Sequence, residues 1–89
     1  MRRLQFTSVA LEDLKYWKET DEKTYNKIKR MIEQIRITPK TGIGKPEPLK
    51  YEWSGYWSRR ITKEHRLVYC SDDKVVIIAQ ARYHYGKKN

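Results

Sequence analysis

Apolar residues in the first half of the chain recur at the spacing of amphipathic helices. Ala10, Leu14 and Trp17 fall on one helical face, and the pattern restarts near Thr20-Asp21. Thr38-Pro39 ends the second segment, because the residue before a proline disfavours helical backbone. The second stripe consists of Tyr25, Ile28, Ile32 and Ile35. The two stripes predict a helical hairpin that buries its apolar faces.

A short strand is expected before the first helix. Leu4 and Phe6 alternate with polar neighbours, which is the period of a half-buried strand. Ser8 has a hydroxyl that could accept a hydrogen bond from a free helical N–H group, so we expect it to cap a helix beginning near Val9.

The second half of the chain has strand character. All three prolines lie between residues 38 and 52, which predicts a constrained loop. Three segments rich in β-branched and aromatic residues follow, at 56–61, 65–70 and 75–85, separated by short polar turns. The sequence therefore predicts an α+β fold, with an N-terminal strand and a two-helix hairpin packed on a mainly antiparallel twisted sheet.

The alternation of side chains predicts which residues share a face of this sheet. Tight turns would place Arg60 opposite Arg66, and Cys70 near Val76. The face covered by the helices would then hold Ile61, Leu67, Tyr69, Val75, Ile77, Ala79, Ala81 and Tyr83. The open face would carry Arg60, Arg66, Gln80, Arg82 and His84, with Val68, Val76 and Ile78 toward its far end. A basic open face bearing a histidine is the result.

Composition and charge narrow the class of partner. Residues 1–89 suffice for one domain with one modest core, and we expect residues 86–89 to form a flexible tail. Twenty Lys and Arg against eleven Asp and Glu give a net charge of +9, which favours a polyanion or an acidic protein as partner. With one cysteine, no signal peptide and no apolar span, the chain is expected in the cytoplasm and away from membranes.

Candidate chemistry gathers in the second half. Metal-free RNA cleavage needs a base for the 2′-hydroxyl, cations for the phosphorane and an acid for the leaving 5′-oxygen. Glu47 lies between two prolines, which fix its backbone, and Lys45 and Lys50 flank it, so it is our candidate base. The alternative is a solvated loop glutamate.

The strands supply the cation and the acid. Arg66 could give two parallel hydrogen bonds to phosphate oxygens, with Arg60 beside it, although an exposed strand arginine is an equal alternative. His84 titrates near neutrality and could protonate a leaving group, or it is simply exposed to solvent. Asp72-Asp73 lies in a predicted turn with no third oxygen ligand implied, so we expect neither a metal nor any other cofactor.

Four ordered motifs resemble one family along nearly the whole chain. They are Gly42-Ile43-Gly44-Lys45-Pro46-Glu47-Pro48-Leu49-Lys50, Ser54-Gly55-Tyr56-Trp57-Ser58-Arg59-Arg60-Ile61, Glu64-His65-Arg66-Leu67-Val68-Tyr69 and Arg82-Tyr83-His84-Tyr85. Together with Tyr16-Trp17-Lys18-Glu19-Thr20-Asp21, they resemble the YoeB/Txe toxins of the RelE superfamily. The resemblance implies the RelE-like microbial RNase fold.

The resemblance also implies a function and roles for residues. The chain would be the toxin of a type II toxin–antitoxin pair, a metal-independent endoribonuclease that cuts mRNA in the A site of the 70S ribosome and halts translation. Its partners would be that ribosome and an acidic antitoxin of the YefM/Axe kind, and a homodimer is plausible. The catalytic residues would be Glu47 as base, His84 as acid, Arg66 as transition-state cation and Tyr85 as a substrate-orienting residue. Lys45, Lys50 and Arg60 would bind RNA, and the basic open face predicts the same for Arg82.

Two other functions remain open from the sequence. Other branches of the superfamily inhibit a protein target such as gyrase without cleaving RNA, and such a toxin would stay toxic without Glu47 and His84. A plain RNA-binding module would bind through its basic face with strong salt dependence and release intact RNA.

Overall fold

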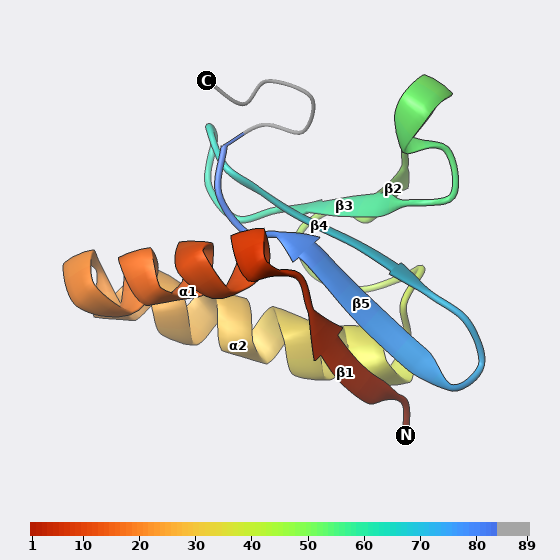
Figure 1. The fold of residues 1–89 in the computed structure, drawn as a ribbon, viewed down its shortest axis with the longest axis horizontal. Coiled ribbons are helices and arrows are strands. Elements are labelled where there is room, and N and C mark those ends of the chain that lie inside the picture. The colour runs from red at the N-terminus through yellow and green to blue at the C-terminus, as the bar shows by residue number, and fades with distance from the viewer. Residues whose placement is uncertain (84–89) are drawn as a thin grey trace.

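The computed structural model describes residues 1–83 and arranges them in two layers, a pair of helices against one sheet (Figure 1). His84, Tyr85 and the tail predicted for residues 86–89 lie outside the described residues. The elements in chain order are β1 (Arg3–Phe6), α1 (Ser8–Thr20), α2 (Glu22–Ile37), β2 (Glu47–Pro48), the 3-10 helix η1 (Tyr51–Trp53), β3 (Trp57–Arg60), β4 (Arg66–Ser71) and β5 (Val75–Gln80).

The sheet has five strands in the order β1-β5-β4-β3-β2. β1 runs parallel to β5, and every other pair is antiparallel, so the predicted α+β architecture is confirmed. β3 and β5 are shorter than the segments predicted from sequence, most of all β5, which ends at Gln80 and not near residue 85, whereas β4 has the predicted length and is shifted by one residue. No helix of residues 1–83 is long and apolar enough to cross a membrane.

The helix boundaries follow from side-chain caps. Thr7, and not Ser8 as predicted, is the cap of α1, and its hydroxyl accepts the Ala10 N–H at 3.0 Å. The Thr7 hydroxyl also donates to the Ala79 carbonyl at 2.7 Å, which ties the start of α1 to β5. At the start of α2, Asp21 accepts the Thr24 hydroxyl at 2.8 Å and the Thr24 N–H at 3.1 Å, and these two bonds, the hydroxyl's first, lower the pKa of Asp21.

The core lies between the helices and one face of the sheet. Both predicted stripes contribute to it, with Ile28 and Ile35 fully buried and Leu14 and Tyr25 packed against its edge. From the strands, and from the residues directly after β3 and β5, the core takes Ile61, Leu67, Tyr69, Val76, Ile78 and Ala81. The predicted packing of helices on an apolar sheet face is therefore confirmed.

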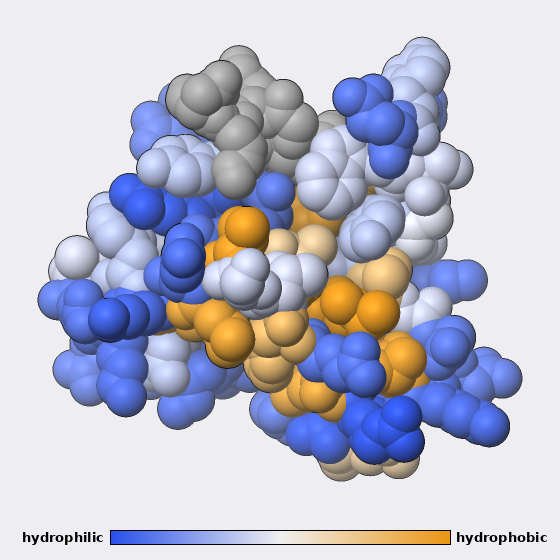
Figure 2. All heavy atoms as spheres, in the orientation of Figure 1, coloured by the Kyte–Doolittle hydropathy of each residue, from blue (hydrophilic) through white to orange (hydrophobic). Residues whose placement is uncertain are grey.

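The sequence prediction assigned the side chains from Val75 to Ala79 to the wrong faces of the sheet. Arg60 does pair with Arg66, but Cys70 pairs with Ile77 and not with Val76. A bulge separates the Val68–Gln80 pair from the Tyr69–Ile78 pair, and an extra residue on one strand reverses the alternation on either side of it. Val76 and Ile78 are consequently buried beneath the helices, whereas Val75, Ile77 and Ala79 are only partly buried on the other face. Figure 2 shows apolar side chains at the surface over β5.

Arg59 on β3 is fully buried on the helix side of the sheet. Its Nε donates to the Tyr69 hydroxyl at 3.1 Å, and Nη1 donates to Gln34 Oε1 at 2.6 Å. The remaining bonds run from Nη1 to the Ile43 carbonyl at 3.2 Å and from Nη2 to the carbonyls of Thr38 and Thr41, both at 2.8 Å. A guanidinium has five N–H donors, and the bonds of Arg59 to these neutral acceptors match that number.

These bonds hold the loop after α2 against the sheet. Tyr69, which accepts from Arg59, donates its own hydroxyl to the Pro39 carbonyl. Gln34 on α2 accepts from Arg59 and also from the Ile43 N–H at 2.8 Å. A segment without helix or strand thus has several of its backbone groups paired with side chains in place of a helical or strand partner.

Replacing Arg59 by Met should lower the free energy of unfolding by about 3 kcal/mol, since several acceptors lose a charged donor at once. Arg60→Met is the matched control, because Arg60 is the next residue and is exposed; it should change stability by less than about 0.5 kcal/mol. Urea unfolding at one fixed protein concentration measures both. Equal losses in the two variants would show that the buried bonds of Arg59 do not stabilise the fold.

Candidate functional site

Residues 44–50 form an arm along the outer edge of β3. The Gly44 carbonyl accepts the Arg60 N–H at 2.7 Å, and the Leu49 N–H donates to the Tyr56 carbonyl at 2.9 Å. Between these bonds, Glu47 pairs with Ser58. Leu49 is buried and anchors the arm. Within the arm, β2 is the last strand of the sheet that residues 1–83 form, and an edge position tolerates prolines because one side of the strand has no strand to bond there.

Glu47 faces the open side of the sheet. Arg59 and its partner Leu67 are buried on the helix side, so their neighbours along the strands point the other way. Ser58 pairs with Val68 on one side and with Glu47 on the other, which puts these side chains in one row of the open face. Ser58 and Val68 are buried, whereas Glu47 is exposed at the end of the row.

Arg60 and Arg66 lie on the same open face, two residues along their strands from Ser58 and Val68. Two strand spacings of about 4.8 Å, with a rise of two residues along the strand, separate the Cα atoms of Glu47 and Arg66 by roughly 12 Å. Their side chains can therefore reach one phosphodiester from two sides. Lys45 and Lys50 flank Glu47 on the arm and are both exposed.

The Arg66 guanidinium is partly engaged by the turn before β4. Its Nη1 donates to the carbonyls of Thr62, Lys63 and His65 at 3.0 to 3.2 Å. The donors on Nε and Nη2 form the other edge of the guanidinium, and two parallel hydrogen bonds from such an edge suit a phosphate. The turn can thus orient Arg66 while leaving it able to bind an anion.

Arg82 does not lie where the alternation of the strand predicted. Its guanidinium carbon is 3.5 Å from the centre of the Tyr16 ring on α1 and 4.7 Å from that of Tyr83. Its Nε is buried with no hydrogen-bond partner among residues 1–83. β5 has already ended at Gln80, so the period of a strand no longer applies. The cation–π contacts join Arg82 to α1, and binding of RNA by this residue stays a prediction.

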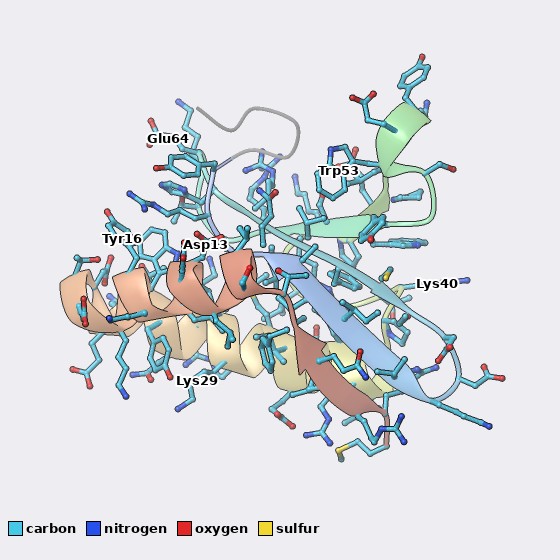
Figure 3. The ribbon with its side chains drawn as sticks, in the orientation of Figure 1. Asp13, Tyr16, Lys29, Lys40, Trp53 and Glu64 are labelled. Carbon is cyan, nitrogen blue, oxygen red and sulfur yellow. The ribbon has the colours of Figure 1, made fainter. Side chains whose placement is uncertain are left out.

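Helix α1 holds the backbone of Ala81 at both of its polar groups. Asp13 accepts the Ala81 N–H at 3.0 Å, and Trp17 Nε1 donates to the Ala81 carbonyl at 2.7 Å. Asp13 and Trp17 are one helical turn apart, so their side chains lie on the same face. Figure 3 shows Asp13 and Tyr16 on the side of α1 toward the sheet. Asp13 has no role in the sequence prediction, and its place one turn before Trp17 is the signal that could have indicated one.

Tyr51 is a second residue that the sequence analysis missed. It is 87% exposed, and its φ of 59° lies in the left-handed region that non-glycine residues rarely adopt. An open pocket of about 370 Å³ is lined by residues 47–51, from Glu47 to Tyr51. In Figure 1 the 3-10 helix η1 that begins with Tyr51 projects away from the sheet. An exposed aromatic ring thus stands beside the candidate base.

The described residues contain no cluster of three or more His, Cys, Asp or Glu side chains that could hold a metal ion. Asp72 caps the turn between β4 and β5, where it accepts the N–H groups of Lys74 and Val75. These two bonds lower the pKa of Asp72. The carboxylate is therefore used by the turn itself.

Comparison with known proteins identifies the family. Residues 6–85 match the model of the YoeB-like toxin of bacterial type II toxin–antitoxin systems. The chain belongs to this family. Toxin YoeB of Escherichia coli is 51% identical over 83 residues, which cover 93% of this chain and 99% of that protein.

Two solved structures from Staphylococcus aureus have the same fold. The YoeB dimer has a TM-score of 0.86 at 46% identity and covers 94% of this chain and 98% of its own. The YoeB–YefM complex has a TM-score of 0.85 at 43% identity and covers 96% of this chain and 99% of its own. The family and the fold inferred from the four ordered motifs are therefore confirmed.

Gly42 offers a test of the loop that leads into the arm. Its φ is +124°, and a Cβ there would lie 1.9 Å from Gln34 Oε1, the atom that accepts from Arg59 and Ile43. Gly42→Ala should therefore combine backbone strain of about 1 kcal/mol with a loss of about 2 kcal/mol in these hydrogen bonds.

Gly55 provides the control for this prediction. Its φ of +94° is also positive, but apart from Gly55 and its two chain neighbours no atom of the described residues lies within 4 Å of a Cβ at this position. Gly55→Ala should cost only the strain of about 1 kcal/mol. Urea unfolding of both variants gives the difference, and a Gly42→Ala variant no less stable than Gly55→Ala would contradict the proposed contact with Gln34.

Proposed function

We propose that this toxin is a metal-independent endoribonuclease that cuts mRNA in the A site of the 70S ribosome and so inhibits translation. The observation that carries the proposal is the common face of Glu47, Arg60 and Arg66, given by the pairing of β2, β3 and β4. It brings an exposed carboxylate and two guanidinium groups to one surface of a strongly basic chain. An acid, a base and cations are the groups that RNA cleavage without a metal requires.

The proposed reaction is an attack of the ribose 2′-oxygen on the adjacent phosphorus. Glu47 accepts the 2′-hydroxyl proton, and Arg66 binds the phosphate oxygens while negative charge builds on them. The bond from phosphorus to the 5′-oxygen breaks, and His84 donates the proton that this oxygen takes up. The products are a 2′,3′-cyclic phosphate and a 5′-hydroxyl. By resemblance to the family, Tyr85 orients the substrate.

The exposure of Glu47 supports a requirement for the ribosome. Water stabilises the charged form of an exposed carboxylate, which makes it a weak base for a hydroxyl proton. A ribosome that presents the RNA in a fixed geometry would cover this surface and hold the 2′-hydroxyl near the carboxylate. Lys45, Lys50 and Arg60 would bind the RNA backbone at the same surface.

Substitutions at the proposed acid, base and cation should lower cleavage of mRNA on programmed ribosomes by at least about 100-fold. The variants are Glu47→Gln, Arg66→Met and His84→Gln, with Glu52→Gln as the control because Glu52 is an exposed carboxylate on η1. Mapping of the cut sites, with analysis of the 3′ ends for the cyclic phosphate, measures the result. Toxicity retained by these variants would favour a protein target such as gyrase, and bound but uncut RNA would favour a plain RNA-binding module.

The same surface is proposed to bind an acidic antitoxin of the YefM/Axe kind. The support is the charge of +9 on this chain and the complex that YoeB of S. aureus forms with YefM. An acidic segment laid across Lys50 and Arg60 would neutralise the cations and cover Glu47. A homodimer is proposed on the likeness to the S. aureus YoeB dimer.

Reversing charge at the site should weaken the antitoxin complex. We expect Lys50→Glu and Arg60→Glu each to raise the Kd for the co-expressed product of the neighbouring open reading frame by about 10-fold at low salt. Lys29→Glu is the control, since Lys29 is an exposed residue of α2 and its substitution changes the net charge by the same amount. The Lys29 Nζ lies 5.2 Å from the centre of the Tyr25 ring. Equal weakening by all three would indicate a general charge effect, and failure to form any complex would contradict the proposed partner.

A further inference from the structure

The backbone turn at Tyr83 is held by two contacts from β4 and the turn before it. The Tyr83 N–H donates to Nδ1 of His65 at 2.8 Å, and the Tyr83 carbonyl accepts the Arg66 N–H at 2.9 Å. Tyr83 has a φ of 64°, in the left-handed region that costs a non-glycine residue of order 1 kcal/mol or more. Such a conformation persists only where its surroundings fix it.

His65 is itself fixed by neighbours on two elements. Its ring packs edge-on against Trp17 of α1, with 5.0 Å between ring centres. Its N–H donates to the Thr62 hydroxyl at 3.2 Å, and its carbonyl accepts the Ile61 N–H at 2.9 Å. Trp17 also binds the carbonyl of Ala81, so one indole contacts both His65 and the residue two before Tyr83.

The bond to Tyr83 requires one protonation state of His65. A backbone N–H can only donate, so Nδ1 must carry a lone pair and the proton of the neutral ring must be on Nε2. A second proton would turn Nδ1 into a donor facing another donor. The neutral imidazole therefore stabilises the turn at Tyr83, and the imidazolium cannot.

We infer that His65 is a positioning residue of the toxin, whose neutral ring fixes the turn at Tyr83 and thereby the start of the segment that carries His84. The inference rests on the proposed function, because it assigns His65 an effect on the proposed acid one residue beyond that turn. His65 need not touch RNA. Its substitution should lower the rate of cleavage more than the binding of the ribosome, because the geometry of a reacting group affects kcat before KM.

The charges around His65 agree with a neutral ring. Partial burial lowers the pKa of His65, and this is the largest effect. Glu64 raises the pKa of His65 and Arg82 lowers it. Asp13 on α1 also raises this pKa, and Arg66 on β4 also lowers it. Because the pKa in the folded chain lies below that of the unfolded chain, the unfolded chain binds the proton first as the pH falls. His65 therefore contributes to the free energy of unfolding in full above about pH 6.5, and this contribution decreases as the pH falls below that value.

The test uses two variants of the full chain that differ in one hydrogen-bond acceptor. In His65→Asn, the side-chain oxygen can take the place of Nδ1 and does not titrate; His65→Leu fills similar space without an acceptor. NMR of the isotope-labelled protein between pH 8 and pH 5 would follow the ring nitrogens of His65 and the exchange of the Tyr83 amide proton. We expect Nδ1 to be unprotonated at pH 8, and the Tyr83 amide to lose protection as His65 titrates.

The two variants should differ both in the protection of the Tyr83 amide and in the rate of mRNA cleavage. His65→Asn should keep the Tyr83 amide protected at pH 5 and cleave mRNA within about 3-fold of the wild-type rate, whereas His65→Leu should lose protection at every pH and lower kcat by about 10-fold or more. A Tyr83 amide that is equally protected in His65→Leu, or a kcat equal to that of the wild type, would overturn the inference. Absence of cleavage by the wild-type chain would contradict the proposed nuclease, while the NMR result would still decide the contact.

Discussion

The bonds of the buried Arg59 guanidinium connect two strands, helix α2 and the loop after α2 at one point. Arg59 lies on β3, and its donors reach α2 through Gln34, β4 through Tyr69 and the loop after α2 through three carbonyls. Burying a cation among neutral acceptors is costly unless every donor is bonded, and here the bonds match the donors. The arm that carries Glu47 begins where this loop ends, so the position of the candidate base depends on a residue on the opposite side of the sheet.

The two helices lie on the other side of the sheet from the open face, but their side chains hold the segments at both ends of the candidate site. Through Gln34, α2 helps Arg59 to hold the loop before the arm. Through Asp13 and Trp17, α1 binds the backbone of Ala81 just after β5. The two ends of the candidate site, at Glu47 and at Tyr83, are therefore each fixed by a different helix. Such support from rigid elements is what precise placement of reacting groups requires.

In the chemistry proposed for the open face, the toxin supplies the reacting groups and the ribosome supplies the placement of the RNA. Glu47 is exposed, with the exposed Lys45 and Lys50 on the same arm, which suits capture of a phosphate backbone but leaves water free to solvate the carboxylate. The turn before β4 binds one edge of the Arg66 guanidinium and so orients it. A ribosome that excludes water and presents the RNA would complete the site, and the same exposed cations would explain inhibition by an acidic antitoxin.

The sequence alone determined the layers of the fold, the family and the surface on which the chemistry was expected. The helical stripes could be read because polar residues interrupt them. Glu47 stood out through its two flanking prolines, and the predicted pairing of Arg60 with Arg66 is confirmed. Only the tertiary structure decided which face of β5 is buried. Val75 to Ala79 is apolar at every position, so alternation gives no signal there, and one bulge reversed the assignment. The roles of Arg59, Asp13 and His65 also needed the folded chain, because their partners lie between 10 and 68 residues away in sequence.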